Sequence, residues 1–352
     1  MPLAHSIREI QNLVSSFHPV IVIETVEEER VHDLLMAATK DMQMAMFEWS
    51  IAQGLGRVAG SFDAPWVNEY APPGTIQAST FENTAEPLPL LKHMADMSLK
   101  ALFWLKDFAK YFDEPVITRQ FRELVQRFAE NRAAIVITGD TVELPPEINH
   151  AAVYFNLKLP EQDELHKAVL EVVRGLKFKR RIQVNISEQD LVVLVQALSG
   201  MTLQQARQVL AYAALEDGQL TAADVRQILH RKSQVIRAGS LLEYYPLDEV
   251  EAELGGFAGL KRWLDQVRVG FSAKARALNL QAPKGILIVG IQGCGKSLAA
   301  KAIAKGWRLP LLKLDAGRLF DKYVGESEKN FRQAVALAES MSPTILWIDE
   351  IE

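Results

Sequence analysis

The stretch that decides the fold is Gly285-Ile286-Leu287-Ile288-Val289-Gly290-Ile291-Gln292-Gly293-Cys294-Gly295-Lys296-Ser297. Its apolar run over 285–290 predicts a short strand buried on both faces. Residues 290–297 then match the phosphate-binding pattern GxxxxGK[ST], and good helix formers follow over 298–304. A buried strand, a glycine-rich loop and a helix in this order predict a P-loop in an α/β sheet.

The residue types of this loop suit a phosphate group. Glycines let successive backbone N–H groups turn inward, and the helix N-terminus adds partial positive charge. Lys296 is expected to reach the β- and γ-phosphates, and the Ser297 hydroxyl to ligate Mg²⁺. Either Cys294 gates nucleotide entry by oxidation, or it fills a position that needs a small residue. We expect ATP to be held by Gly290, Ile291, Gln292, Gly293, Cys294, Gly295, Lys296, Ser297 and Leu298.

A second strand end supplies two carboxylates. The apolar run over 344–348 ends at Asp349-Glu350, and in a parallel sheet it ends at the same edge as the P-loop strand. Asp349 is expected to hold Mg²⁺ through water, and Glu350 to orient or deprotonate the attacking water. Without a P-loop elsewhere in the sequence, we would interpret these two carboxylates as solvent-exposed residues with no functional role. Next to a P-loop, Glu350 becomes a catalytic candidate together with Lys296.

The hydrophobic pattern predicts two α/β regions separated by helices. In the second half, a strand over 310–315 and an amphipathic helix over 327–341 lie between the two motifs, which indicates a parallel sheet. In the first half, Thr25 and Glu28 predict a capping box that opens a helix. Residues 54–87 predict a long loop. The remaining elements predicted there are strands at 20–23, 45–50, 99–105, 133–138 and 152–157 and a helix at 121–129.

The two halves resemble each other. Residues 102–107 match residues 345–350 in their apolar pattern and in the position of a tryptophan. This match indicates a divergent tandem repeat. The alternative is two unrelated α/β domains, since any two such domains can share the same alternation of strands and helices. The pattern is purely helical over about 161–236, with helix starts expected at Ser187, Thr202 and Thr221. The predicted divisions are an α/β domain at 1–160, a helical subdomain at 161–236, a linker at 237–255 and an α/β core at 256–352.

The P-loop, Lys322-Tyr323-Val324-Gly325-Glu326-Ser327-Glu328-Lys329 and Ile345-Leu346-Trp347-Ile348-Asp349-Glu350 together resemble the AAA ATPase family. The P-loop variant is similar to that of AAA proteins encoded in cyanobacterial and plastid genomes and found in other bacteria. The resemblance implies Mg·ATP binding, ATP hydrolysis, a protein partner or substrate, and a homo-oligomer such as a hexameric ring. It places Tyr323 and Val324 in a pore-loop-like segment that grips substrate. Alternatively, Tyr323 packs against its own domain.

The first half resembles the same family without its nucleotide machinery. Residues 157–172 and 197–214 look like the helical lid of an AAA core, with Arg207 near a sensor position. Residues 25–29 (Thr-Val-Glu-Glu-Glu) replace the glycine loop, and their carboxylates would repel phosphate. Lys106 stands where the metal ligand is expected, so a cation would confront Mg²⁺. We expect this degenerate copy not to hydrolyse ATP.

The resemblance also implies segments after Glu352. A fourth strand between the first and third, a sensor residue, an arginine finger and a second lid would follow the Asp-Glu pair in an AAA core. We therefore expect this sequence to be a truncated form of a longer protein, with a second sheet that lacks a middle strand. Without those parts, the alternative function is a nucleotide-binding scaffold or regulator without turnover.

Composition limits the remaining classes. The 352 residues are 49% hydrophobic and 24% charged, which excludes a disordered chain. One cysteine excludes an internal disulfide and a multi-cysteine zinc site. A net charge of −5 argues against a nucleic-acid remodeller, and the basic run 177–181 is expected to be a solvated turn. No apolar run predicts a membrane span or secretory signal, so a cytoplasmic protein, or a stromal one if plastid-encoded, is expected. A regulatory link to photosynthesis or carbon use is implied only by the resemblance.

Overall fold

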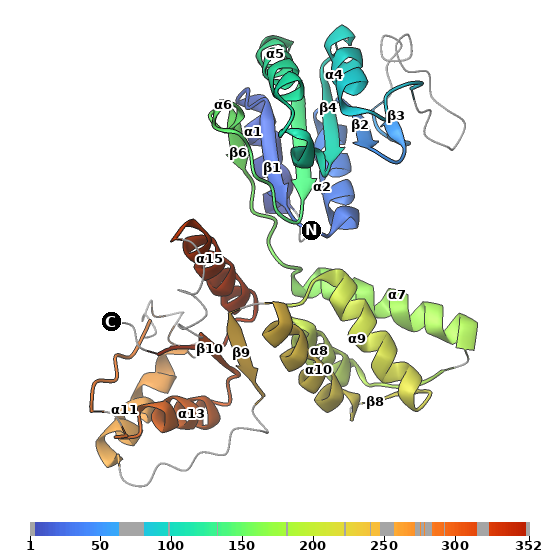
Figure 1. Ribbon diagram of the computed structural model, residues 1–352. Helices are drawn as coiled ribbons and strands as arrows, with labels where there is room; N and C mark the ends of the chain where they lie inside the picture. Colours follow the sequence, from blue (N-terminus) through green and yellow to red (C-terminus); the bar gives the residue numbers. More distant parts are fainter. Residues whose placement is uncertain are drawn as a thin grey trace. The chain divides into compact units, whose positions relative to one another are not determined.

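The computed structural model describes most of the chain (Figure 1). The described residues are 4–62, 81–97, 99–131, 133–180, 182–221, 223–239, 241–246, 257–271, 275, 278, 284–291, 293–314 and 324–349. The chain divides into two compact units, Met1–Leu157 and Lys158–Glu352. Each unit is described by itself.

The first unit is built on a sheet in the order β3-β2-β4-β5-β1-β6. Every neighbouring pair is parallel except β2 and β3, which are antiparallel. Parallel strands with helices between them bury both faces, and the four central strands are accordingly almost continuous apolar runs. The strands are β1 (Val20–Glu24), β2 (Ala45–Ser50), β3 (Gly54–Arg57), β4 (Ala101–Lys106), β5 (Ala134–Gly139) and β6 (Ala152–Tyr154).

Helices cover both faces of this sheet (Figure 1). Val20 and Val22 of β1 lie in the cluster that includes α4 (Pro87–Asp96) and α5 (Pro115–Asn131). Ile21 and Ile23 lie in the cluster that includes α1 (Ala4–Ser15) and α2 (Glu28–Asp41). The alternation follows from the two-residue period of a strand. A 3-10 turn at Phe108–Tyr111 and the short α6 (Pro146–Asn149) complete the unit.

The second unit begins with four helices. They are α7 (Gln162–Arg180), α8 (Glu188–Leu198), α9 (Leu203–Glu216) and α10 (Asp224–Gly239). The predicted helix starts at Ser187 and Thr202 are confirmed, and each residue forms a capping box that opens α8 or α9. Thr221 lies three residues before α10 and donates its hydroxyl to Asp224. Two short strands, β7 (Gln183–Asn185) and β8 (Gln219–Thr221), pair in parallel beside these helices, so the region is not purely helical.

The second sheet has the order β11-β10-β9 among the described residues. β10 (Leu311–Leu314) pairs in parallel with β11 (Ile345–Ile348) and antiparallel with β9 (Leu242–Tyr245). Three helices, α11 (Ala258–Arg268), α13 (Lys296–Trp307) and α15 (Val324–Ser340), belong to the same region, and a 3-10 turn at Val269–Phe271 follows α11. β9 falls inside the segment predicted to be a linker, so that part of the prediction is wrong: Leu242 and Tyr244 are buried and complete an edge of the sheet.

Three other local predictions are also wrong. The run 285–290 forms no strand in the structure, and Leu287 and Val289 are 76% and 83% exposed. A strand needs a neighbour for its backbone groups, and none lies beside this run among the described residues. The predicted loop 54–87 contains β3, which pairs with β2. Thr25 does not cap α2: the cap position is Glu27, whose N–H donates to the Thr25 hydroxyl at 3.0 Å.

Candidate functional site

The glycine-rich loop leads directly into α13. Gly293 and Gly295 have φ angles of +82° and +92°, in the left-handed region that a side chain disfavours. No atom would clash with a Cβ at either position, so conformation and not space is the reason for glycine here. Gly295 is the N-cap of α13, and its carbonyl accepts the Ala299 N–H at 2.9 Å. The loop therefore ends at the positive end of a helix dipole.

Lys296 folds back over the loop that precedes it. Its Nζ donates hydrogen bonds to the carbonyl oxygens of Gly290 at 2.8 Å and Ile291 at 3.1 Å. The ammonium group is thus held on the carbonyl oxygens of the turn that leads into α13. A cation and unpaired helix N–H groups at one place suit an anion such as a phosphate.

The side chains around Lys296 are accessible. Cys294 is an exposed free thiol, and its Sγ lies against Gly290, where an added Cβ would come within 2.6 Å of it. Ser297, the expected metal ligand, is exposed at the start of α13, and Leu298 is 39% exposed. Gln292 lies outside the described residues. The described part of the loop can therefore receive a ligand from solvent.

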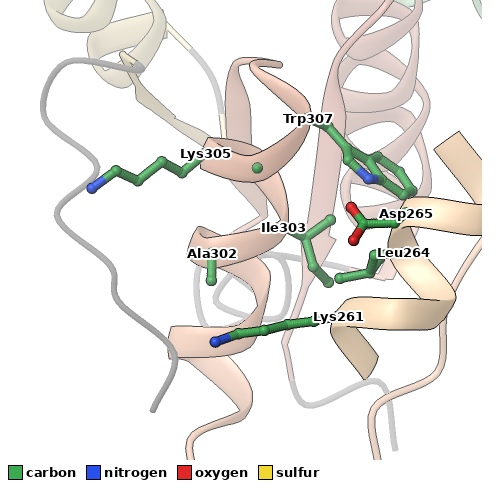
Figure 2. Close-up of a pocket in the computed structure, with 8 residues that line it drawn as sticks. Lys261, Leu264, Asp265, Ala302, Ile303, Lys305 and Trp307 are labelled. Atoms are coloured by element: carbon green, nitrogen blue, oxygen red, sulfur yellow. The ribbon is translucent and has the colours of Figure 1, made fainter. Parts of the chain in front are cut away.

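A pocket of about 330 Å³ lies between α11 and α13 (Figure 2). The residues of α13 that line it lie in the second half of that helix. With a rise of 1.5 Å per residue, Trp307 lies about 16 Å along the helix axis from Lys296. It is therefore distinct from the glycine loop. Its lining residues are Lys261, Leu264, Asp265, Ala302, Ile303, Lys305, Gly306 and Trp307.

The carboxylate pair is described only in part. Asp349 directly follows β11 and is half-buried, whereas Glu350 lies outside the described residues. Within the described parts of the chain, no hydrogen bond or ion pair joins Asp349 to Lys296 or Ser297. In the described residues, the run before the loop is not paired into the sheet that contains β11. Tyr323 lies outside the described residues, and Val324 is the first residue of α15.

The first unit has a different arrangement at the corresponding strand end. Lys106, the last residue of β4, forms ion pairs with Glu28 at 3.2 Å and Glu48 at 3.5 Å. Its Nζ also lies 4.2 Å from the centre of the Trp104 ring. A lysine with three partners fills the position where a metal ligand would be needed.

The loop after β1 is also filled from within. Glu27 and Arg30 form an ion pair at 2.9 Å, with side chains only 6% and 5% exposed. The Glu27 carboxylate lies at the start of α2, as an anion would at a phosphate-binding helix. Arg30 was not predicted to be a site residue. The signal in the sequence was a glutamate followed three residues later by an arginine at the start of a helix, a spacing that favours an ion pair.

The residues present fit a nucleotide phosphate at the second unit. Lys296, the N-terminus of α13 and the left-handed glycines supply positive charge and donors, and Ser297 and Asp349 are oxygen ligands that suit Mg²⁺. Among the described residues, no group of three or more His, Cys, Asp or Glu side chains forms a metal site without a nucleotide. No helix in the described ranges is both long and apolar enough to cross a bilayer.

Three family models match the chain. Residues 6–157 match the N-terminal domain of SpoVK-like AAA ATPases, and residues 163–239 match the second domain of the same proteins. Residues 286–352 match the model of the ATPase family associated with various cellular activities (AAA). The matches follow one another along the chain without overlap.

Curated relatives match almost the whole chain. The uncharacterized AAA domain-containing protein ycf46 of Pyropia yezoensis is 32% identical over 98% of this chain and 66% of its own length. The protein of the same name from Guillardia theta is 33% identical over 98% of this chain and 64% of its own. The 26S proteasome regulatory subunit 6A of Saccharomyces cerevisiae is 43% identical over 22% of this chain and 18% of its own. The chain thus spans about two thirds of the length of the first two.

Proposed function

Because the chain belongs to the AAA ATPase family, we propose that its second unit binds Mg·ATP at residues 290–298. Lys296 and the N–H groups at the start of α13 would hold the phosphates. Ser297, and Asp349 through water, would hold the metal ion, which neutralises charge on the phosphates when bound. The observation that carries this proposal is the Lys296 ammonium held on the carbonyls of Gly290 and Ile291.

ATP hydrolysis is the second part of the proposal. Glu350 would orient or deprotonate the attacking water, and the energy would be coupled to remodelling or regulation of a protein partner. By family resemblance the chain would act in a homo-oligomeric ring, with Tyr323 and Val324 contacting the substrate. The compartment would be the cytosol, or the stroma if the protein is plastid-encoded. A regulatory role in photosynthesis or carbon use belongs to the same proposal.

We propose that the first unit does not bind nucleotide. Lys106, paired with Glu28 and Glu48, places a cation where the metal ion would sit. The buried pair of Glu27 with Arg30 places a carboxylate where the phosphates would bind. The unit would instead be a structural or partner-binding domain. Exactly one nucleotide per chain is then expected in a titration, and two would contradict this part of the proposal.

The test is a titration of the chain with a fluorescent ATP analogue and Mg²⁺. Lys296→Ala should weaken the saturable binding by about 10- to 150-fold, since it removes charge-assisted hydrogen bonds. Lys305→Ala is the matched control, because it removes the same charge from an exposed position on the same helix. Equal binding by wild type and Lys296→Ala would refute the site.

A nucleotide-dependent scaffold without turnover is the second candidate. No hydrogen bond or ion pair joins Asp349 to the described part of the P-loop, and this observation favours the scaffold. Single-turnover hydrolysis at high protein concentration separates the two functions. Turnover that Glu350→Gln lowers by a factor on the order of 10²–10⁴, with binding retained, supports the ATPase. Binding without any turnover supports the scaffold.

A further inference from the structure

Helix α10 carries a lysine in the middle of its buried stripe. Leu229, Lys232 and Ile236 are spaced i, i+3 and i+7, so they share one face of the helix. Lys232 is only 2% exposed. A lysine is almost never fully buried unless it is paired. Leucine would be the more stable residue here, so the position calls for a functional explanation.

The face that includes Lys232 closes a junction inside the second unit. Ile236, with Leu229 at its edge, packs in one cluster with β9, β10 and α15, and the Lys232 Nζ lies 5.1 Å from the centre of the Tyr244 ring on β9. Gly200, between α8 and α9, adds a close approach: a Cβ there would lie 2.5 Å from Met341 Cγ. The remaining members of the cluster are Leu242, Leu312, Leu314, Ala334, Ala338 and Met341.

No hydrogen bond or ion pair joins Lys232 to a charged group on the packed elements that the structure describes. On β9, Glu243 accepts the Tyr245 hydroxyl at 2.8 Å and lies 4.0 Å from Arg237. On β10, Lys313 lies over Trp347, and on α10 Arg231 lies over Tyr212. On α15, Arg332 and Glu339 are the described charged residues. None of the ion pairs among the described residues includes Lys232.

Burial without a carboxylate partner disfavours the ammonium form. Desolvation lowers the pKa of Lys232 from 10.5 to about 7. If the junction opened, water would hydrate the amine and restore an ordinary pKa. The open form therefore holds more protons than the closed form between about pH 7 and pH 10, and opening becomes more favourable as pH falls through that range. Below about pH 7 both forms are protonated, and the effect levels off.

We propose that Lys232 is a proton-controlled latch between the helical segment 162–239 and the second sheet. The junction is closed when the amine is neutral and loosens when it takes up a proton. Loosening changes how firmly α10 holds β9 and α15, the elements that flank the strand pair ending at Asp349. The latch is a property of the apolar junction and does not depend on ATP turnover.

Hydrogen exchange of the full chain, measured by mass spectrometry at pH 6.5, 7.5 and 8.5, tests the latch. Rates are corrected for the intrinsic pH dependence of exchange, and peptides covering 242–245 and 334–341 are compared. Wild type should open about five- to tenfold more often at pH 7.5 than at pH 8.5, since each pH unit above the pKa changes the protonated fraction about tenfold. Lys232→Met should exchange slowly with no such dependence. An equal pH dependence in Lys232→Met, or a flat profile in wild type, overturns the proposal.

Two further variants complete the test. His230→Gln removes an exposed histidine of the same helix, so it must keep the wild-type profile. Its loss of the pH dependence would assign the effect to His230 and overturn the proposal. Lys232→Arg keeps a charge at every pH, so its peptides should exchange fast throughout. Slow exchange in this variant at pH 6.5 would also overturn it.

Discussion

The two sheets share a three-strand pattern and differ in what lies next to it. In the first unit β3 pairs antiparallel with β2, and β2 pairs in parallel with β4; in the second, β9, β10 and β11 repeat this order. β4 is then covered by β5 on its other edge, whereas β11 has no further neighbour among the described residues. β4 is accordingly buried along its length, and β11 is half-buried.

The two segments that lead into the loops also differ in whether neighbouring strands cover them. β1 lies between β5 and β6, and Val20 to Ile23 are fully buried. The run 285–290 has a similar composition but no partner strand within the described ranges, and most of it is exposed. Both neighbours of β1, β5 and β6, come after β4 in the chain. Neighbours that arrive late in the sequence, and not the apolar residues themselves, determine whether such a run becomes a strand.

The two tryptophans at equivalent positions give the largest expected difference. Trp104 on β4 is 1% exposed, and its Nε1 donates to the Thr138 hydroxyl at 2.8 Å. Trp104→Ala should lower the free energy of unfolding of the first unit by about 3–5 kcal/mol. Trp347→Ala on the half-buried β11 should cost about 1 kcal/mol or less. Chemical denaturation, with hydrogen exchange to assign each transition to a unit, measures both. Equal losses would show that β11 is packed as tightly as β4.

The second-largest effect is expected for the buried ion pair of Glu27 with Arg30 in the loop after β1. Glu27→Gln leaves the guanidinium of Arg30 without its carboxylate in a site that is about 95% buried on each side chain. We expect a loss of about 3 kcal/mol in the first unit, since removing one partner of a buried pair leaves an uncompensated charge. Glu29→Gln on the exposed side of the same helix is the control and should stay within about 0.5 kcal/mol. If both variants unfold at the same denaturant concentration, the pair does not hold the loop.

Removing the lysine from each loop edge should affect nucleotide binding in only one unit. Lys296→Ala should weaken binding of the fluorescent ATP analogue by about 10- to 150-fold, equivalent to one charge-assisted hydrogen bond of about 1.5–3 kcal/mol. Lys106→Ala should leave the affinity unchanged, because that amine is already paired with Glu28 and Glu48. A weaker affinity in Lys106→Ala would place nucleotide at the first unit as well.

The smallest effect concerns the stability contributed by Lys106. Its side chain is 20% exposed, and Glu28 is 54% exposed, so solvent screens the pairs. Lys106→Met should lower stability by about 1 kcal/mol or less, and the loss should shrink in high salt. Thermal unfolding at low and high ionic strength measures it. A large loss that does not change with salt would indicate that the methylene chain over Trp104 matters more than the charge.

Local patterns predicted much of the fold. The AAA family was predicted from the resemblance of three motifs, and the comparisons confirm it. The α/β class, the strands β1, β2, β4 and β5 and the helix starts at Ser187 and Thr202 were predicted from short-range patterns, and the structure confirms them. The short strands β3, β7, β8 and β9 were missed, because three or four residues carry too little periodicity and their pairing is decided by distant segments.

The candidate site was predicted only as far as its motif. The loop and its lysine follow from the pattern at 290–297, but the return of the Lys296 amine to the loop carbonyls depends on backbone geometry. The internal pair of Glu27 with Arg30 and the burial of Lys232 depend on tertiary packing. The roles of Glu350 and Tyr323 stay predictions, since both lie outside the described residues.

The strand order of the first unit also determines when each strand can pair while the chain is being synthesised. β1 ends at Glu24, but its parallel partner β5 begins only at Ala134. At about 5–20 residues per second, a ribosome needs on the order of ten seconds to make the chain between them. During that interval the fully buried residues of β1 have no neighbouring strand, although β2 and β4 can already pair with each other. The nascent first unit therefore closes from its edge inward, and β5 is the last central strand to be inserted.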